Sequence, residues 1–317
     1  MPGRAAALLR YRVGLLPGPA LRRQPCAERV GLALRLDEGS RQGWGEIAPL
    51  PGFSRETLGE AQAEACRWLE RWLAGVCPAE PVLPAVAFGI DCALAELDGR
   101  LPTAAAYATA TLWSGAAAAL PDAARVKLKV GDAAPEDDAM TVALFAAMPT
   151  RVLRLDANRA WTLAQAQAFA RAVPPAQRAR IEFIEEPCRS PQESLAFAAA
   201  AGLPIAWDES LREPGFALTP QPGVRAIVVK PMLTGGLTRC RELVDRAHAL
   251  GLAAVISSSI ESSLGLTQLA RLAAWLTPQT TPGLDTLATM PAQVLRAWPG
   301  VALPLLTPED LECLWAG

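Results

Sequence analysis

From about residue 105 onward, short apolar runs alternate with amphipathic stretches, and this alternation limits the possible folds more than any other feature of the sequence. Runs with the length and composition of β-strands lie at 108–113, 125–130, 151–156, 181–186, 204–209, 225–230, 253–258 and, more weakly, 281–286. One helical pattern, such as DDAMTVALFAAM, separates most of them. Strands and helices at this spacing predict an α/β barrel rather than an open doubly wound sheet. No GxGxxG motif follows any run, so nothing supports a dinucleotide-binding fold.

The first hundred residues follow a different pattern. Short strands with turns are expected between 4 and 48, and helices at 56–74, with Ser54 as the N-cap, and at 85–97. We therefore divide the chain into an α+β domain at 1–100, a barrel at 101–299 and a C-terminal tail at 300–317 that packs on the first domain.

Charge and composition exclude several classes of partner. The chain has 30 basic and 32 acidic residues, so its net charge of −2 does not attract it as a whole to nucleic acid or to an anionic membrane. The apolar run before Arg10 is too short for a secretory signal, and no stretch has the ~18 consecutive apolar residues of a membrane span. The seven scattered cysteines fit reduced thiols. We expect a cytoplasmic protein whose partner is a small molecule.

A single histidine limits the chemistry. His248 lies in a helical stretch without a nucleophile or a second metal ligand near it, so we expect an ordinary helix residue. This argues against Ser-His-Asp catalysis and against histidine-rich metal sites. Proton transfer would have to use Lys, Asp, Glu or one of only two tyrosines.

Three carboxylates lie at the ends of successive expected strands. Asp156, Glu185 and Asp208 are each separated by about one βα repeat. In a barrel the carboxyl ends of the strands meet at one mouth, so we expect these side chains to converge. Three carboxylates in a low-dielectric site repel one another unless a cation holds them, and an all-oxygen set suits a hard ion such as Mg²⁺.

Three lysines accompany these carboxylates. Lys127 and Lys129 are two residues apart, so a strand points both to the same face, and Lys230 ends the strand that follows Asp208. In a parallel sheet that face is buried, and buried ammonium groups are costly unless anions face them. The carboxylates supply those anions. The sequence therefore predicts a cleft with lysines on both sides of a carboxylate–metal cluster.

Each of these residues also has a simpler interpretation. The lysine pair fits a charged edge strand, Asp156 a turn, and Glu185 or Glu186 the cap of the next helix. Asp208 fits an N-cap, and Lys230 a solvated strand end. Because chance rarely places all of them at consecutive strand ends, their joint occurrence favours a functional site.

Much of the chain resembles the enolase superfamily, and within it the dehydratases of menaquinone biosynthesis. The resemblance rests on GWGEIAPLPGFS (43–54), VAFGIDCALAEL (86–97), VKLKVG (126–131), LRLDANRAW (153–161), EEPC (185–188), AWDESLREP (206–214), VVKPMLTGGL (228–237), ISSSIESSLGLTQLARLAAWLTP (256–278) and PGLDTL (282–287). It implies a modified TIM barrel, (β/α)7β, with an N-terminal α+β capping domain that the C-terminal tail completes.

The resemblance also implies a role for each polar residue of the mouth. The implied Mg²⁺ ligands are Asp156, Glu185 and Asp208, the implied general base is Lys129, and the implied cation on the opposite face is Lys230. Burial, the metal and the charge of Lys127 disfavour a protonated Lys129, so we expect its pKa to be lowered.

The substrate carboxylate is expected at the serine-rich strand end. We expect Ser257 and the backbone of Gly283 to bind it, with Arg154 in support. The loop at 14–27 and the segment at 49–54 are expected to fold over the mouth.

The reaction implied by the resemblance is the syn dehydration of 2-succinyl-6-hydroxy-2,4-cyclohexadiene-1-carboxylate through an enediolate to an aromatic product. Two alternatives remain open at this point. One is an N-acylamino acid racemase or dipeptide epimerase, in which Lys129 and Lys230 alternate as acid and base. The other is a barrel that keeps Mg²⁺ for stability and acts only as a binding protein.

Overall fold

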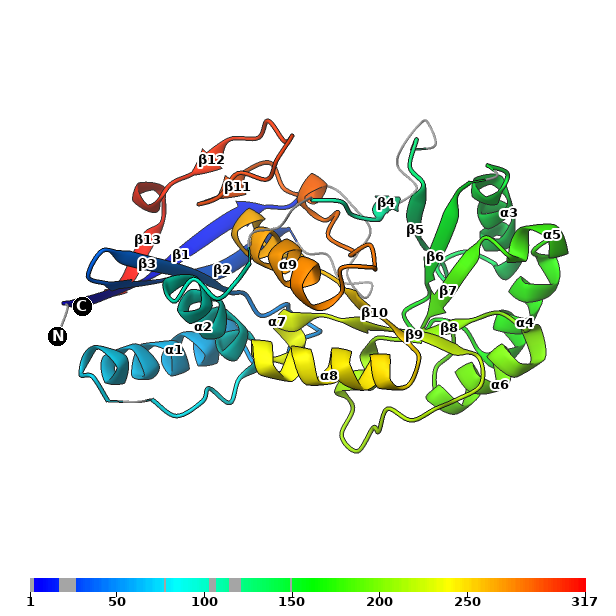
Figure 1. Cartoon of the computed structure of the whole chain (residues 1–317). Helices are drawn as coiled ribbons and strands as arrows, with labels where there is room; N and C mark the ends of the chain where they lie inside the picture. Colours follow the sequence, from blue (N-terminus) through cyan, green and yellow to red (C-terminus); the bar gives the residue numbers. More distant parts are fainter. Residues whose placement is uncertain (1–2, 17–26, 77, 103–106, 114–120, 149) are drawn as a thin grey trace.

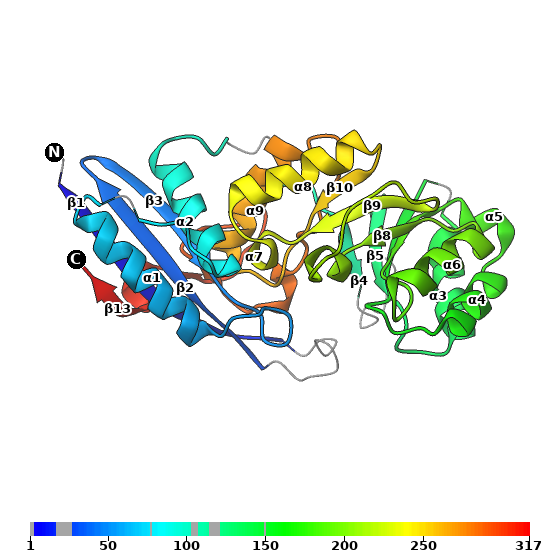
Figure 2. The same ribbon diagram turned by 90° about the horizontal axis from the view of Figure 1, so that it is seen from below.

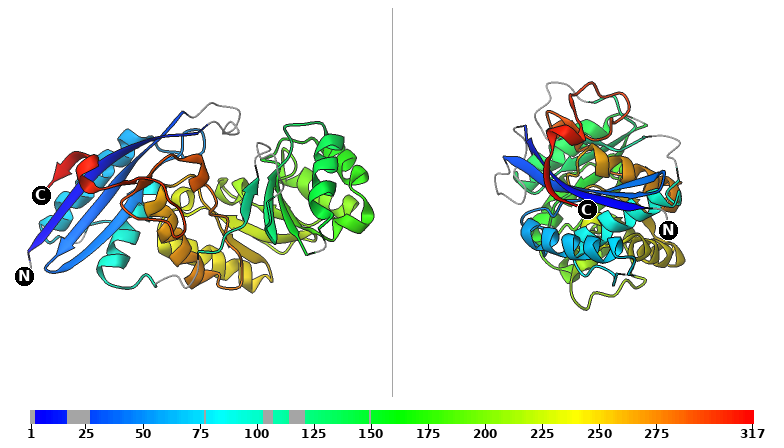
Figure 3. Two further views of the ribbon diagram at one scale, coloured as in Figure 1. Left: turned by 90° about the horizontal axis from the view of Figure 1, so that it is seen from above. Right: turned by 90° about the vertical axis from the view of Figure 1, so that its left-hand side faces the viewer.

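The computed structural model describes residues 3–16, 27–76, 78–102, 107–113, 121–148 and 150–317, and a four-stranded antiparallel sheet stands at one end of it (Figure 1). Its strands are β1 (Arg4–Gly14), β2 (Glu28–Glu38), β3 (Arg41–Ile47) and β13 (Glu312–Ala316), in the order β13-β1-β2-β3. In the β1–β13 pair Leu8 lies opposite Trp315. The C-terminal strand therefore completes the N-terminal sheet, as Figure 3 shows.

Two helices pack against this sheet, α1 (Leu58–Leu73) and α2 (Pro84–Leu97) (Figure 2). Thr57 caps α1, rather than the expected Ser54, because its side chain exchanges capping hydrogen bonds with Glu60. α2 lies directly on β3, since a Cβ at Gly45 would come within 1.8 Å of the Gly89 carbonyl oxygen. This close approach requires glycine at position 45.

Among the described residues, seven parallel strands follow, and they stand in the sheet in their sequence order. They are β4 (Thr111–Trp113), β5 (Arg125–Lys129), β6 (Val152–Asp156), β7 (Ile181–Glu185), β8 (Ile205–Trp207), β9 (Val224–Val229) and β10 (Ala253–Ile256). Parallel neighbours require crossover connections, and helices provide most of them. These helices are α3 (Pro135–Ala146), α4 (Leu163–Ala172), α5 (Pro175–Arg178), α6 (Pro191–Ala201), α7 (Pro231–Thr234) and α8 (Leu237–Ala249), with α9 (Ser263–Leu276) after β10.

Residues 282–285 link the two edges of this sheet. Gly283 N donates to Ile256 O at the end of β10, and Ala110 N, just before β4, donates to Pro282 O, both at 2.9 Å. Ser258 N returns a bond to Gly283 O at 2.9 Å. The weak strand expected at 281–286 is thus a short bridging segment that connects β10 to β4. The fold is the predicted α/β barrel of the modified TIM type with an N-terminal capping domain.

Shorter elements complete the described chain. They are the helical turns η1 (Glu209–Arg212), η2 (Leu287–Thr289) and η3 (Pro308–Asp310) and the parallel pair β11 (Gln293–Val294) and β12 (Leu305–Leu306). None of the helices in the described residues is long and apolar enough to cross a bilayer. The division of the chain at residues 100 and 299 stays a prediction.

Candidate active site

A pocket at the carboxyl ends of the barrel strands collects most of the polar residues that the sequence singled out. Its empty volume is about 970 Å³, a figure that includes open solvent at its mouth. The described residues that line it are Leu50, Phe53, Ala110, Leu112, Trp113, Lys127, Lys129, Asp156, Asn158, Lys230, Leu233, Ser257, Ser258, Ser259, Ile260, Gly283, Asp285 and Thr286. Charged groups thus share one cavity with an apolar wall and a run of serines.

Lys127 is held between two of the predicted metal ligands. Its Nζ lies 2.9 Å from Asp156 Oδ2 and 2.6 Å from Glu185 Oε2. The three residues meet because β5, β6 and β7 are neighbours and place these side chains on one face. Burial lowers the pKa of Lys127, but the charges of Asp156 and Glu185 outweigh burial and raise it above its ordinary value. Lys127 is therefore a fixed positive charge.

The two carboxylates respond differently to this environment. Burial opposes ionisation of Asp156, yet Lys127, Lys129 and Lys230 together hold its pKa well below the usual range. Burial raises the pKa of Glu185 to about 7, and the negative charges of Asp156 and Asp208 add to this effect. The positive charge of Lys127 beside it opposes this rise in pKa but does not cancel it.

Lys230 and Asp208 form a second buried ion pair. Lys230 Nζ lies 2.5 Å from Asp208 Oδ2, and Arg212 Nη1 lies 2.8 Å from Asp208 Oδ1. Burial lowers the pKa of Lys230, but the charge of Asp208 outweighs it and raises the pKa. Glu186 turns away from the mouth with a φ of 40° and accepts hydrogen bonds from Asp208 N at 3.0 Å and Ser210 N at 2.8 Å. Glu185 pairs with Lys127, which lines the pocket, and Glu186 fixes the backbone that carries Asp208.

Lys129 is held by a residue that the sequence analysis did not assign a role. Its Nζ donates to Asn158 Oδ1 and lies 4.0 Å from Asp156 Oδ1. Asn158 has a φ of 41°, and its Nδ2 donates to Glu209 Oε1 at 3.0 Å. The only sequence signal for Asn158 was its place two residues after Asp156, in a turn where asparagine tolerates a left-handed backbone.

The predicted metal ligands fit a hard divalent cation by their chemistry. Asp156, Glu185 and Asp208 are buried carboxylates, and the charges of Asp156 and Asp208 add to the burial that raises the pKa of Glu185. Among the described residues, however, no three His, Cys, Asp or Glu side chains are arranged to hold a metal ion. Ammonium and guanidinium groups lie within 3 Å of Asp156 Oδ2, Glu185 Oε2 and both carboxylate oxygens of Asp208. Their role as ligands stays a prediction.

The predicted substrate-binding residues separate into two groups. Ser257 and Gly283 line the pocket, and Ser257 Oγ donates to Gly283 O at 3.2 Å. Arg154 lies outside the described lining, because its side chain donates to Glu182 Oε2 and Thr281 O, both at 2.7 Å. It points to the same side of β6 as Asp156 but belongs to a deeper layer, where it stabilises the barrel.

Of the two predicted lid segments, 49–54 contributes Leu50 and Phe53 to the pocket wall. Residues 17–26 of the other segment, the loop at 14–27, lie outside the described residues.

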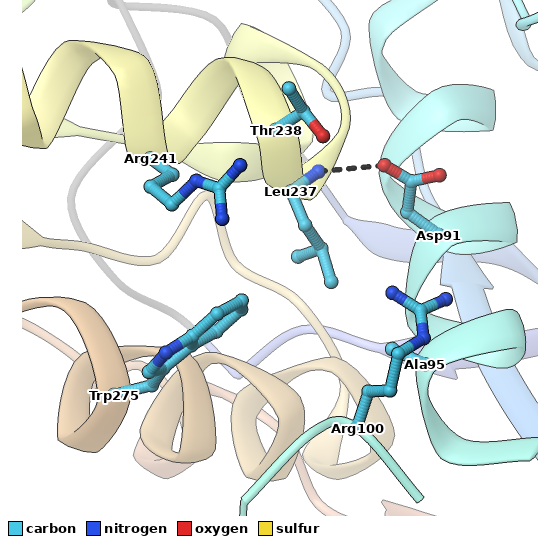
Figure 4. A pocket seen from close by; sticks show the side chains of 7 residues that line it. All are labelled: Asp91, Ala95, Arg100, Leu237, Thr238, Arg241 and Trp275. Carbon is cyan, nitrogen blue, oxygen red and sulfur yellow. Dashed lines mark hydrogen bonds between the residues drawn. The ribbon is translucent and has the colours of Figure 1, made fainter. Parts of the chain in front are cut away.

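A second pocket lies where α2 meets α8 and α9 (Figure 4). Among the described residues, it shares no lining residue with the first pocket, and its lining includes neither Lys127, Lys129 nor Lys230. Asp91 on α2 points to the start of α8, where Leu237 N donates to its Oδ2 at 2.8 Å. This carboxylate caps a barrel helix from the capping-domain side.

The barrel, its capping domain and a mouth of lysines and carboxylates define a member of the enolase superfamily. A family model described as "Enolase C-terminal domain-like" matches residues 87–296, and one described as "MenC, N-terminal domain" matches residues 3–97. The o-succinylbenzoate synthase of Edwardsiella ictaluri (strain 93-146) is 56% identical, over 99% of this chain and 100% of that protein. That of Enterobacter sp. (strain 638) is 55% identical, over 98% of this chain and 99% of that protein. The chain belongs to the o-succinylbenzoate synthase family.

Solved structures agree with this assignment. The o-succinylbenzoate synthase from Thermosynechococcus elongatus BP-1, complexed with Mg in the active site, has a TM-score of 0.70 at 25% identity, over 95% of this chain and 96% of that one. The L-Ala-D/L-Glu epimerase from Bacillus subtilis has a TM-score of 0.71 at 19% identity, over 90% of both chains. Because the epimerase is only 19% identical to this chain, its similarity shows the fold alone.

Proposed function

We propose that this chain catalyses the Mg²⁺-dependent syn dehydration of 2-succinyl-6-hydroxy-2,4-cyclohexadiene-1-carboxylate to o-succinylbenzoate in menaquinone biosynthesis. The observation that carries the residue assignment is the placement of two lysines around the barrel. Lys129 ends β5 and Lys230 follows β9, four strands further along a ring of seven strands and one bridging segment. The two ammonium groups therefore approach a bound substrate from opposite sides.

Lys129 is the general base and then the general acid. Its Nζ takes the proton from the carbon next to the substrate carboxylate, and the electron pair of that C–H bond moves into the carboxylate to give an enediolate. When the electrons return, the C–O bond to the ring hydroxyl breaks, and the same Nζ gives its proton to the leaving oxygen to form water. One lysine serves both steps, so elimination is syn. Asn158 holds this lysine in place.

The substrate carboxylate gains negative charge during proton removal, and fixed cations stabilise it. Lys230 remains protonated because Asp208 raises its pKa, so it faces the enediolate as a positive charge. Asp156, Glu185 and Asp208 would hold Mg²⁺, and the bound ion would supply Lewis-acid stabilisation of this charge. Lys127 keeps the ligand carboxylates close together and limits their repulsion.

The serine-rich end of the pocket binds the rest of the substrate. Ser257 and the Gly283 backbone offer polar groups beside the apolar wall of Leu50 and Phe53. A pocket of polar groups on one side and apolar side chains on the other suits a ring with carboxylate substituents. We place the enzyme in the cytoplasm, with a small carboxylate substrate and no nucleic-acid or membrane partner.

The test is an assay with Mg²⁺ and the cyclohexadiene acid, followed by the absorbance of o-succinylbenzoate. Wild-type protein should form the product, and Lys129→Ala should lose turnover by a factor of about 10² to 10⁴. Undiminished turnover in Lys129→Ala would remove the assignment of the base. Racemisation of N-succinyl amino acids without dehydration would favour the N-acylamino acid racemase alternative, in which Lys129 and Lys230 share the proton transfer.

A further inference from the structure

Arg29, on β2 of the capping domain, is buried, with only 1% of its surface exposed. All of its hydrogen bonds described here end on main-chain carbonyl oxygens. Nε donates to Ile260 O at 2.8 Å, Nη1 to Pro49 O at 2.6 Å, and Nη2 to Ala48 O and, at 3.5 Å, to Ser259 O. A buried cation bonded in this way fixes the backbone of every segment that it touches.

The segments joined by Arg29 form two walls of the active-site pocket. Ala48 and Pro49 lead directly into Leu50, which lines the pocket on the capping-domain side. Ser259 and Ile260 line it on the barrel side. One guanidinium therefore sets the spacing between a wall from each domain.

The backbone on the barrel side of this contact is strained at Ile260. Ile260 has a φ of 60°, a conformation that is costly for a β-branched residue. It persists only where surrounding contacts hold it, and the bond from Arg29 Nε to its carbonyl is such a contact. Loss of the guanidinium would let the segment 257–260 relax.

Two buried carboxylates hold the segment 257–260 and the residues that follow it. Glu261 Oε2 accepts from Ser259 N at 2.6 Å. Glu46 accepts from Ser262 N at 2.9 Å, from Ser262 Oγ at 2.6 Å and from Gly265 N at 2.7 Å. The positive charge of Arg29 offsets these negative charges at the junction of the two domains.

We propose that Arg29 is a positioning residue for substrate binding: it fixes the distance between the capping-domain wall and the serine segment 257–260. This inference rests on the proposed function. Arg29 has no described contact with Lys129. Loss of Arg29 should therefore lower the affinity for substrate and product while the geometry of proton transfer by Lys129 stays intact. Such a loss of uniform binding raises KM more than it lowers kcat.

The test compares Arg29→Ala with Asp91→Ala. Asp91 also joins the capping-domain side to the barrel, but at the second pocket, so its loss removes a contact between the same parts without touching the active-site walls (Figure 4). For Arg29→Ala we expect KM and the Kd of o-succinylbenzoate, measured by calorimetry, to rise at least about tenfold with a smaller change in kcat. Added methylguanidinium should reverse part of the effect, whereas potassium chloride at equal ionic strength should not.

Three results would overturn the proposal. The first is an unchanged KM and product Kd in folded Arg29→Ala. The second is a rise of KM and product Kd in Asp91→Ala equal to that in Arg29→Ala. The third is that methylguanidinium does not rescue Arg29→Ala. If Arg29→Ala does not fold, Arg29→Lys keeps the charge but loses donors, and it should still raise KM and the product Kd. Failure of the proposed function would look different, because wild type itself would then form no product.

Discussion

Replacing Glu261 by glutamine should change how the stability of this protein depends on pH. Glu261 is fully buried, and burial together with the charge of Glu46 raises its pKa to about 7. The charged and titratable groups that face it are Glu46 on β3, Arg29 on β2 and Tyr11 on β1. Its Oε1 has no hydrogen-bond partner among the described residues, so ionisation of the group is poorly compensated.

Because the pKa of Glu261 is raised in the folded protein, its contribution to stability falls as the pH rises. A glutamate in the unfolded chain has a pKa of about 4.3. Between that pH and about 7, the folded protein therefore keeps a proton on Glu261 that the unfolded chain has lost. The contribution of Glu261 to stability is complete below the lower value and is lost as pH rises through the upper one. A shift of between two and three pKa units corresponds to about 3 kcal/mol.

Urea unfolding of wild type and Glu261→Gln at about pH 5 and about pH 8 measures this effect. The amide keeps an acceptor for Ser259 N and does not ionise, so the variant should gain about 2 to 3 kcal/mol relative to wild type between the two pH values. Glu242→Gln on the exposed side of α8 is the control and should show no such gain. An equal stability difference at both pH values would refute a buried, titrating Glu261.

Other expected outcomes concern the active site and the contact between α2 and α8. Asn158→Ala should lower kcat by about tenfold or more because Lys129 loses the acceptor that orients its Nζ, whereas Asn158→Asp keeps an acceptor and should retain more activity in the dehydration assay. Lys230→Ala should lower kcat without abolishing Mg²⁺ binding, as calorimetry can show, because it removes the fixed cation and not a ligand. Asp91→Ala should lower the free energy of unfolding by about 1 kcal/mol, measured by urea titration, while KM stays that of wild type.

The sequence predicted those features that follow from strand periodicity. Lys127, Lys129 and Asp156 lie on one face because residues two apart in a strand share a face, and neighbouring parallel strands bring them to Glu185. The order of the barrel strands followed from the alternation of apolar runs and helices. These relations depend on local geometry and a regular topology, both of which a sequence records.

Features that depend on the depth of a side chain within the barrel, or on contact between the domains, could not be predicted. Arg154 shares a face with Asp156, but periodicity does not tell which layer of the barrel a residue occupies, and Glu182 holds it away from the pocket. Asn158 acquires its role from a left-handed turn. Arg29 bonds to Ile260, which lies 231 residues further along the chain. A single sequence carries no signal for such a contact.

A crystal structure with Mn²⁺ in place of Mg²⁺ and with bound o-succinylbenzoate would test the assignment of the site most directly. We expect one anomalous peak coordinated by Asp156, Glu185 and Asp208, with Lys129 and Lys230 on opposite faces of the product ring. A metal bound elsewhere, or a product that lies beyond the reach of Lys129 Nζ, would contradict the proposed site.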